Sequence, residues 1–285
     1  MSQLIQMRQR IKAIGTIKKI TSAMRLISRS FHMRMHRDRT HLQDYTQALT
    51  HIFNKTIACT GSTVSHSYEI SAQQQFKELY IIIGSQKGLC GSFNTTITHW
   101  IDKNRETLLQ PQSHVLVLGK KINEYLKKQG VLHAQLLPEL KLITIDALVK
   151  NILNTMTDKK RGYTKVVAIA NSPKTFFSHE YKVTQLIPFV TPQTTCSNDL
   201  FDYTQVHDPK LIIETLTNMH LMVSVHSLLF ESLLGEQASR FIAMDNATRN
   251  ANKFLDTMKL QFNKMRQAKI TKELTELAGA FETQF

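Results

Sequence analysis

The C-terminal part of the chain lacks the residues that usually end a helix. After Pro209 there is no further proline, and the only glycines are Gly235 and Gly279. One helix can therefore extend through residues 209–285. At the helical rise per residue, about 70 residues would span roughly 100 Å. The core of one small domain cannot cover so long a helix, so we expect it to pair with a second long helix.

The same stretch carries a coiled-coil pattern. Mostly apolar residues recur between residues 241 and 265 at alternating steps of three and four, which is typical of a heptad seam. The seam consists of Phe241, Met244, Thr248, Ala251, Leu255, Met258, Phe262 and Met265.

A second long pattern lies at the other end of the chain. Residues 1–58 contain no proline and a single glycine, Gly15. Apolar residues recur there with a period close to that of a coiled coil, and we interpret the steps around Ile17 as a local phase slip. They are Leu4, Met7, Ile11, Ile14, Ile17, Ile20, Met24, Ile27 and Phe31.

Two long helices at opposite chain ends predict a long antiparallel coiled coil with a domain inserted in its connection. Short apolar, β-branched runs alternate with helical patterns in the middle of the chain, which predicts a mostly parallel sheet covered on both faces. The expected strands are residues 79–84, 114–118, 165–170 and 182–189, with 131–137 and 198–203 as further candidates. The fold class is therefore α/β, divided into a shaft helix (1–58), a linker (59–76), a Rossmann-like α/β domain (77–208) and a second shaft helix (209–285).

Positive charge is concentrated at the N-terminus. The chain has a formal net charge of +14, and residues 1–40 hold ten lysines and arginines against one acid, Asp38. Nucleic acid, anionic lipid and an acidic protein surface are the candidate partners of such a helix. The cations are spread around the helix, which fits enclosure by acidic protein better than contact with one groove. A basic coiled-coil protein that binds nucleic acid is the alternative.

Catalytic patterns are weak. Residues 84–94 (GSQKGLCGSFN) follow a strand and open a helix, but they match neither the P-loop nor the dinucleotide fingerprint. A tight strand-to-helix turn explains the glycines, and a nucleotide-dependent enzyme is the alternative. The three cysteines are scattered and form no CxxC pair, and no run of 18 apolar residues occurs. We expect no catalytic residue, no metal site and no cofactor.

Four motifs in order resemble one family. They are MRQRIKAI with KKITSAM (residues 7–14 and 18–24), GLCGSFN (88–94), EQASRFIAMDNATRNA (236–251) and NKMRQAKITKELTEL (263–277). They are similar to segments of the γ subunit of F-type ATP synthases. Gln86 stands where that family usually has an acid. The resemblance is close at both ends of the chain and thin in the middle.

The resemblance implies a non-catalytic central-stalk rotor. Family members turn inside a ring of α and β subunits, contact the ε subunit and the c-subunit ring, and couple proton flow to ATP synthesis. Membrane contact is expected only through the complex, and nucleic acid is not an expected partner. The expected location is peripheral, on the cytoplasmic face of a bacterial plasma (inner) membrane, with the matrix side of a mitochondrial inner membrane as the alternative. Both H⁺ and Na⁺ are compatible with it as the coupling ion.

The resemblance also implies which side chains meet the α and β subunits. Met24 and Arg25 match family positions that face an acidic loop of a β subunit. Three further matches lie near the end of the second helix, and one lies near its middle. The full set of implied partner-binding residues is Met24, Arg25, Arg240, Gln267, Thr271 and Glu273.

Overall fold

The chain forms two compact units in a computed structural model that describes residues 2–60, 77–158, 162–173, 179–188 and 209–282. The helical unit comprises Met1–Arg29 and Arg240–Phe285, and the sheet unit comprises Ser30–Ser239. Each long helix contributes one part to each unit. The sequence-based division instead kept each helix whole, because periodicity shows how far a helix extends but not what packs against it.

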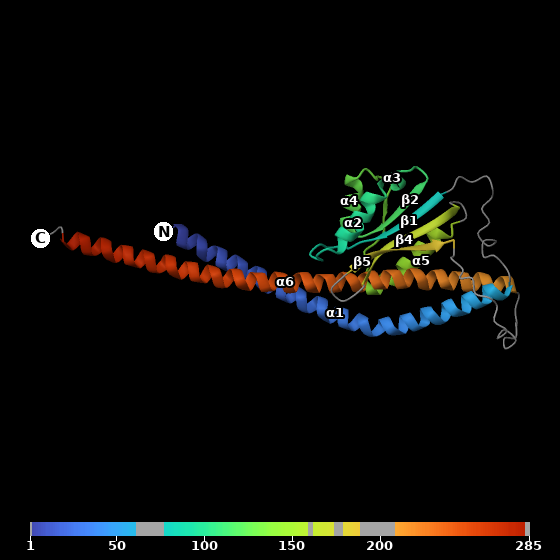
Figure 1. Cartoon of the computed structure of the whole chain (residues 1–285), viewed down its shortest axis with the longest axis horizontal. Coiled ribbons are helices and arrows are strands. Elements are labelled where there is room, and N and C mark those ends of the chain that lie inside the picture. The colour runs from blue at the N-terminus through green and yellow to red at the C-terminus, as the bar shows by residue number, and fades with distance from the viewer. Residues whose placement is uncertain (1, 61–76, 159–161, 174–178, 189–208, 283–285) are drawn as a thin grey trace. The chain divides into compact units, whose positions relative to one another are not determined.

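The two terminal helices are as long as the sequence predicts. Helix α1 spans Ser2–Thr60 and helix α6 spans Pro209–Glu282 (Figure 1). Both belong to a mixed α/β fold, as expected. Most of the predicted linker, from residue 61 onward, lies outside the described residues, and so does the strand candidate at 198–203.

The sheet unit is built on five strands in the order β3-β2-β1-β4-β5. Strand β1 (Lys77–Ile83) lies at the centre and runs parallel to β2 (Ser113–Leu118) and β4 (Tyr163–Pro173). Strand β3 (Gln135–Leu136) pairs parallel with β2, and β5 (His179–Ile187) pairs antiparallel with β4. The prediction of a mostly parallel sheet is confirmed. Strand β3 covers only the end of the candidate run 131–137.

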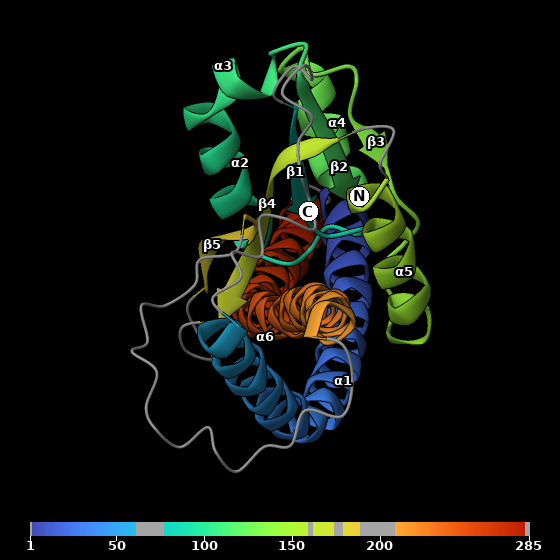
Figure 2. The same ribbon diagram turned by 90° about the vertical axis from the view of Figure 1, so that its right-hand side faces the viewer.

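Helices cover both faces of this sheet. Side chains alternate along β1, so Tyr80 and Ile82 pack on one face while Leu79, Ile81 and Ile83 pack on the other. The first face meets α2 (Phe93–Lys103), α3 (Arg105–Leu108) and α4 (Lys120–Lys128). The second meets α5 (Ile145–Met156), the short 3₁₀ helix before it (Leu142–Thr144), and the parts of α1 and α6 that belong to this unit. Figure 2 shows α2 and α5 on opposite sides of the sheet.

The glycine-rich stretch after β1 is a tightly bonded turn. The Ser85 backbone N–H donates to Asn94 Oδ1 at 3.1 Å, and Asn94 Nδ2 donates to Ser85 Oγ at 2.7 Å. Leu89 and Gly91 both have positive φ values, 65° and 57°. A Cβ on Gly84 would lie 2.2 Å from Cγ1 of Ile122, so glycine is required where the turn passes α4. These contacts support the interpretation of a strand-to-helix turn.

Gln86 has a role of its own in this turn. Its Oε1 accepts a hydrogen bond from the backbone N–H of Lys120 at 3.2 Å, at the first residue of α4. The first N–H groups of a helix lack partners within the helix, so this side chain satisfies one of them. A neutral amide thus serves as a helix cap at the position where the resembled family usually carries an acid.

Candidate functional site

In the helical unit, α1 and α6 pair antiparallel. Arg25 Nη1 lies 2.7 Å from Asp245 Oδ1, and the Thr21 and Thr248 hydroxyl oxygens are 3.0 Å apart. The guanidinium carbon of Arg8 lies 5.8 Å from the ring centroid of Phe262. Lower numbers on α1 meet higher numbers on α6, and the two residue numbers of each contact add up to nearly the same value, so all three contacts belong to one antiparallel register.

The α6 seam lies where the heptad pattern predicts. Met244, Thr248, Ala251 and Leu255 are buried, and the other four seam residues are half-buried. The large side chains Phe254 and Leu260, which fall outside the pattern, are exposed. Burial therefore confirms this stripe as the contact face of the helix.

The prediction for α1 is wrong at three positions beyond Ile14. Ile17, Ile20 and Ile27 are 52%, 54% and 68% exposed, so they do not lie in the seam. The inward side continues the heptad without a slip, through Leu4, Met7, Ile11, Ile14, Lys18, Thr21, Arg25 and Ser28. Hydrophobicity misled the prediction because this seam turns polar, while an apolar stripe runs along the outer side of the helix.

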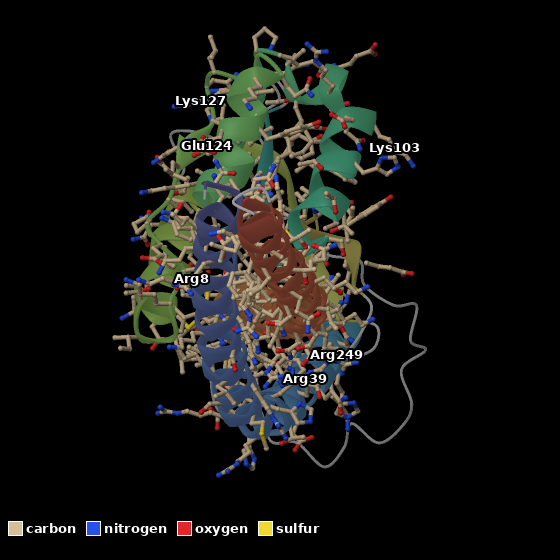
Figure 3. The ribbon with its side chains drawn as sticks, turned by 90° about the vertical axis from the view of Figure 1, so that its left-hand side faces the viewer. Arg8, Arg39, Lys103, Glu124, Lys127 and Arg249 are labelled. Atoms are coloured by element: carbon tan, nitrogen blue, oxygen red, sulfur yellow. The ribbon has the colours of Figure 1, made fainter. Side chains whose placement is uncertain are left out.

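The polar seam residues have partners. The Thr21 hydroxyl lies 3.1 Å from the Lys18 carbonyl oxygen, and that of Thr248 lies 2.7 Å from the Met244 carbonyl oxygen. Asp245 is also paired with Arg249 Nη2 at 2.8 Å, one helical turn along α6. The hydrogen bond from Arg25 lowers the pKa of the Asp245 carboxyl, and the charge of Arg249 adds to this against the opposing effect of burial. Arg8 and Arg249 are labelled in Figure 3.

The predicted partner-binding residues fall into two groups. Met24 and Arg25 on α1 are half-buried, and Arg240 on α6 is buried. Arg25 reaches Asp245, which follows Arg240 by a little over one helical turn. The second group, Gln267, Thr271 and Glu273, is exposed near the end of α6. At the helical rise per residue, about 30 Å of helix separates the two groups.

The end of α6 exposes its whole circumference. Residues 271–278 are all exposed. Ile270, Leu274 and Leu277 form an apolar stripe on one side and are 47%, 61% and 58% exposed. The helix there is reinforced by the ion pairs Lys269–Glu273 (3.3 Å) and Lys272–Glu276 (3.7 Å). The sequence prediction did not single out this stripe, and it assigned Ile17, Ile20 and Ile27 to the seam, whereas they form an exposed outer stripe on α1.

The described parts of the chain show no group of three or more His, Cys, Asp or Glu side chains placed to hold a metal ion. No helix among the described residues is long and apolar enough to cross a membrane.

Comparison with known proteins identifies the family. The family model described as ATP synthase matches residues 3–283. The ATP synthase gamma chain of Clostridium novyi is 30% identical over 99% of this chain and 98% of its own length. That of Clostridium botulinum strain Hall is 31% identical, with the same coverage. The chain belongs to the ATP synthase gamma chain family.

Solved structures agree on the fold. A chain of the central stalk and c-ring of the Tetrahymena thermophila mitochondrial ATP synthase matches with a TM-score of 0.56 and 22% identity. The match covers 80% of this chain and 99% of that one. A chain of the Euglena gracilis mitochondrial ATP synthase matches with a TM-score of 0.57 and 16% identity, over 92% and 95% of the two chains. Long terminal helices joined to an α/β sheet are thus shared with known ATP synthase chains.

These findings confirm the resemblance found in the sequence motifs. The chain is a subunit of ATP synthase, a membrane-bound complex, and it does not itself catalyse the reaction. The alternative of a nucleic-acid-binding coiled coil gains no support from the matched proteins.

Proposed function

We propose that the paired helices act as the rotating central stalk of the complex, enclosed by its ring of α and β subunits. The observation that carries this proposal is the exposed end of α6, whose apolar stripe has no cover from the described residues. Apolar surface of this kind marks a site of contact with another protein. Enclosure by a ring also fits the cations that face outward around α1.

The asymmetry of the paired helices supplies a mechanism. Near Met24 the outer side of α1 is apolar, whereas the Arg249 side of α6 is charged. Beyond Ser2, where α1 begins, the described part of the pair consists of α6 alone. A stalk with these unequal sides presents a different surface to each β subunit at each angle. It then acts as a ligand that favours one conformation of each neighbour in turn, and rotation driven by proton flow changes which conformation is favoured.

The two predicted groups of partner-binding residues fit this mechanism in different ways. Gln267, Thr271 and Glu273 are exposed and available to surrounding subunits. Met24 is half-buried beside the outer apolar stripe. Arg25 and Arg240 take part mainly by shaping the helix pair, because one is paired to Asp245 and the other is buried.

The other expected partners are the ε subunit and the c-subunit ring. The structure from Tetrahymena thermophila is a central stalk with its c-ring, which supports this part of the proposal. We place the complex on the cytoplasmic face of a bacterial plasma membrane, and the bacterial origin of the similar gamma chains supports that placement. The matrix side of the mitochondrial inner membrane is the alternative.

The first test is recovery of the complex. The tagged chain is purified from its native membranes, its companions are identified by mass spectrometry, and ATPase activity is measured. Recovery of α, β and ε subunits, with ATPase activity that the isolated chain lacks, is the expected result. Activity of the isolated chain, or recovery of nucleic acid in place of these subunits, would contradict the proposal.

A second test concerns the exposed end of α6. Gln267→Leu combined with Thr271→Val keeps the side-chain volumes but removes polar groups, so coupled ATP synthesis in membrane vesicles should fall about tenfold. Thr257→Val combined with Gln261→Leu is the matched control, because both residues are exposed on the same helix at the same spacing. Equal activity of the two double variants would show that the tip has no special role.

A further inference from the structure

The polar part of the seam contains two contacts that join α1 to α6. Thr21 and Thr248 are buried, with their hydroxyl oxygens 3.0 Å apart. In the adjacent layer Arg25 and Asp245 form their ion pair at 2.7 Å. We call these four residues the register lock.

Apolar layers by themselves specify the alignment of two helices poorly. Next to the register lock, Lys18 lies level with Ala251, and the layers beyond them are formed by Leu, Ile, Met and Phe side chains. Such apolar side chains tolerate one another in many combinations. Sliding one helix past the other by a heptad, about 10 Å, would again place apolar side chains opposite apolar side chains. A polar layer breaks this equivalence, because the hydroxyl–hydroxyl contact and the ion pair form in one alignment only.

The alternative alignments can be worked out from the observed register. A slip of one heptad in either direction would place Thr21 level with Leu255 or with Phe241 instead of Thr248. The same slip would carry Arg25 away from Asp245. Each slipped state therefore buries a threonine hydroxyl against an apolar side chain and separates the ion pair.

We propose that the register lock fixes the axial alignment of the α1 and α6 segments that form the helical unit. Its role as a positioning device for the rotor rests on the function proposed above. Alignment decides how far the exposed end of α6 extends beyond α1, and which α6 surface lies beside the outer stripe of α1. Arg25 therefore has a structural role within its own chain, in addition to any contact with a β subunit.

Cysteine cross-linking in the full chain tests the lock directly. Cys59 and Cys196 are replaced by serine, and the buried Cys90 is kept. Ile11→Cys is then combined with one of three substitutions on α6. In the observed register Ile11 lies level with Met258, so Met258→Cys reports the native alignment. Met265→Cys and Ala251→Cys report a slip of one heptad in either direction.

With the register lock intact, cross-linking should favour Met258→Cys over the other two positions by at least about tenfold. The test variant replaces the lock by apolar residues of similar size, through Thr21→Val, Thr248→Val, Arg25→Met and Asp245→Leu. Helical circular dichroism should be retained, while the preference should fall to about twofold or less. An unchanged preference in this variant would overturn the proposal.

Three further variants keep the test decisive. If the fourfold variant does not fold, Thr21→Val with Thr248→Val alone should weaken the preference, and unchanged cross-linking there would equally refute the lock. Arg25→Lys retains a cation beside Asp245 and should preserve the native cross-link. Lys121→Met with Glu124→Leu removes an exposed ion pair of α4 and is the control for charge, with no expected effect.

The consequence for the rotor is measured separately, in the complex. Proton pumping per ATP hydrolysed should fall about twofold or more with the lock replaced, and should be unchanged with the α4 control. Slipped cross-links with unchanged coupling would refute the positioning role. Failure of the unmodified chain to recover α and β subunits would instead refute the proposed function, and the cross-linking result would still decide whether the lock exists.

Discussion

The sheet unit and the helical unit bury their side chains in opposite ways. In the sheet unit two apolar layers enclose the strands, and residues such as Phe93, Ile97 and Leu118 are fully buried. In the helical unit only one stripe of each helix is covered, part of that stripe is polar, and large apolar side chains face outward. The sheet unit is therefore organised for its own stability, whereas the helical unit leaves its surface for other molecules.

Two glycines provide the strongest test of this contrast. A Cβ on Gly119 would lie 2.6 Å from the carbonyl oxygens of both Gly84 and Ser85, and Gly119 has a φ of +99°. Gly119→Ala should therefore destabilise the sheet unit by about 2–4 kcal/mol. Gly15 on α1 has no atom within 4 Å of such a Cβ, so Gly15→Ala should stabilise the helix by about 0.5–1 kcal/mol. The free energy of unfolding in urea measures both effects. If both substitutions changed it in the same direction, the contrast between the two units would be contradicted.

The ion pair of the helical unit should respond to pH. The pKa of Asp245 is lowered in the folded chain, so the pair stabilises the protein above the unfolded carboxyl pKa of about 3.9. That stabilisation is lost as the pH falls through the folded pKa. Asp245→Asn should cost about 1 kcal/mol or less at pH 7 and nothing at a pH well below 3. Thermal unfolding at both pH values measures the difference, and a cost that does not shrink at low pH would argue against the ion pair.

The smallest effect on the isolated chain is expected at the end of α6. Leu274→Ser with Leu277→Ser removes apolar groups that are exposed, so its free energy of unfolding should change by no more than about 0.5 kcal/mol. Recovery of α and β subunits with the tagged chain should nevertheless fall. A large loss of stability would mean that these side chains are covered within the chain itself.

Periodicity and strand composition were enough to predict the architecture. Residues 241–265 follow a strict heptad, and the structure buries that stripe. The apolar runs of β1, β2 and β4 are continuous because the sheet covers them on both faces. The bounds of β3 were not predicted, because a count of apolar residues does not show which of them pair with β2.

The α1 seam could not be predicted from apolar residues alone. Thr21 and Arg25 lie inside because Thr248 and Asp245 lie opposite them. These partners are far from α1 in the sequence, so the N-terminal pattern alone does not reveal the pairing. Strict heptad counting from Leu4 would have reached Lys18, Thr21 and Arg25. The partner-binding roles of Gln267, Thr271 and Glu273 stay predictions, because they depend on subunits other than this chain.

The exposed end of α6 has a consequence for the cell that makes this protein. A newly synthesised chain carries the apolar stripe of Ile270, Leu274 and Leu277 on its surface until partners cover it. Such a surface promotes self-association and recognition by chaperones and proteases. The net charge of +14 counters self-association by repulsion between copies, but it does nothing to hide the stripe. Production of the chain in step with its partners is therefore as important to its survival as the stability of its fold.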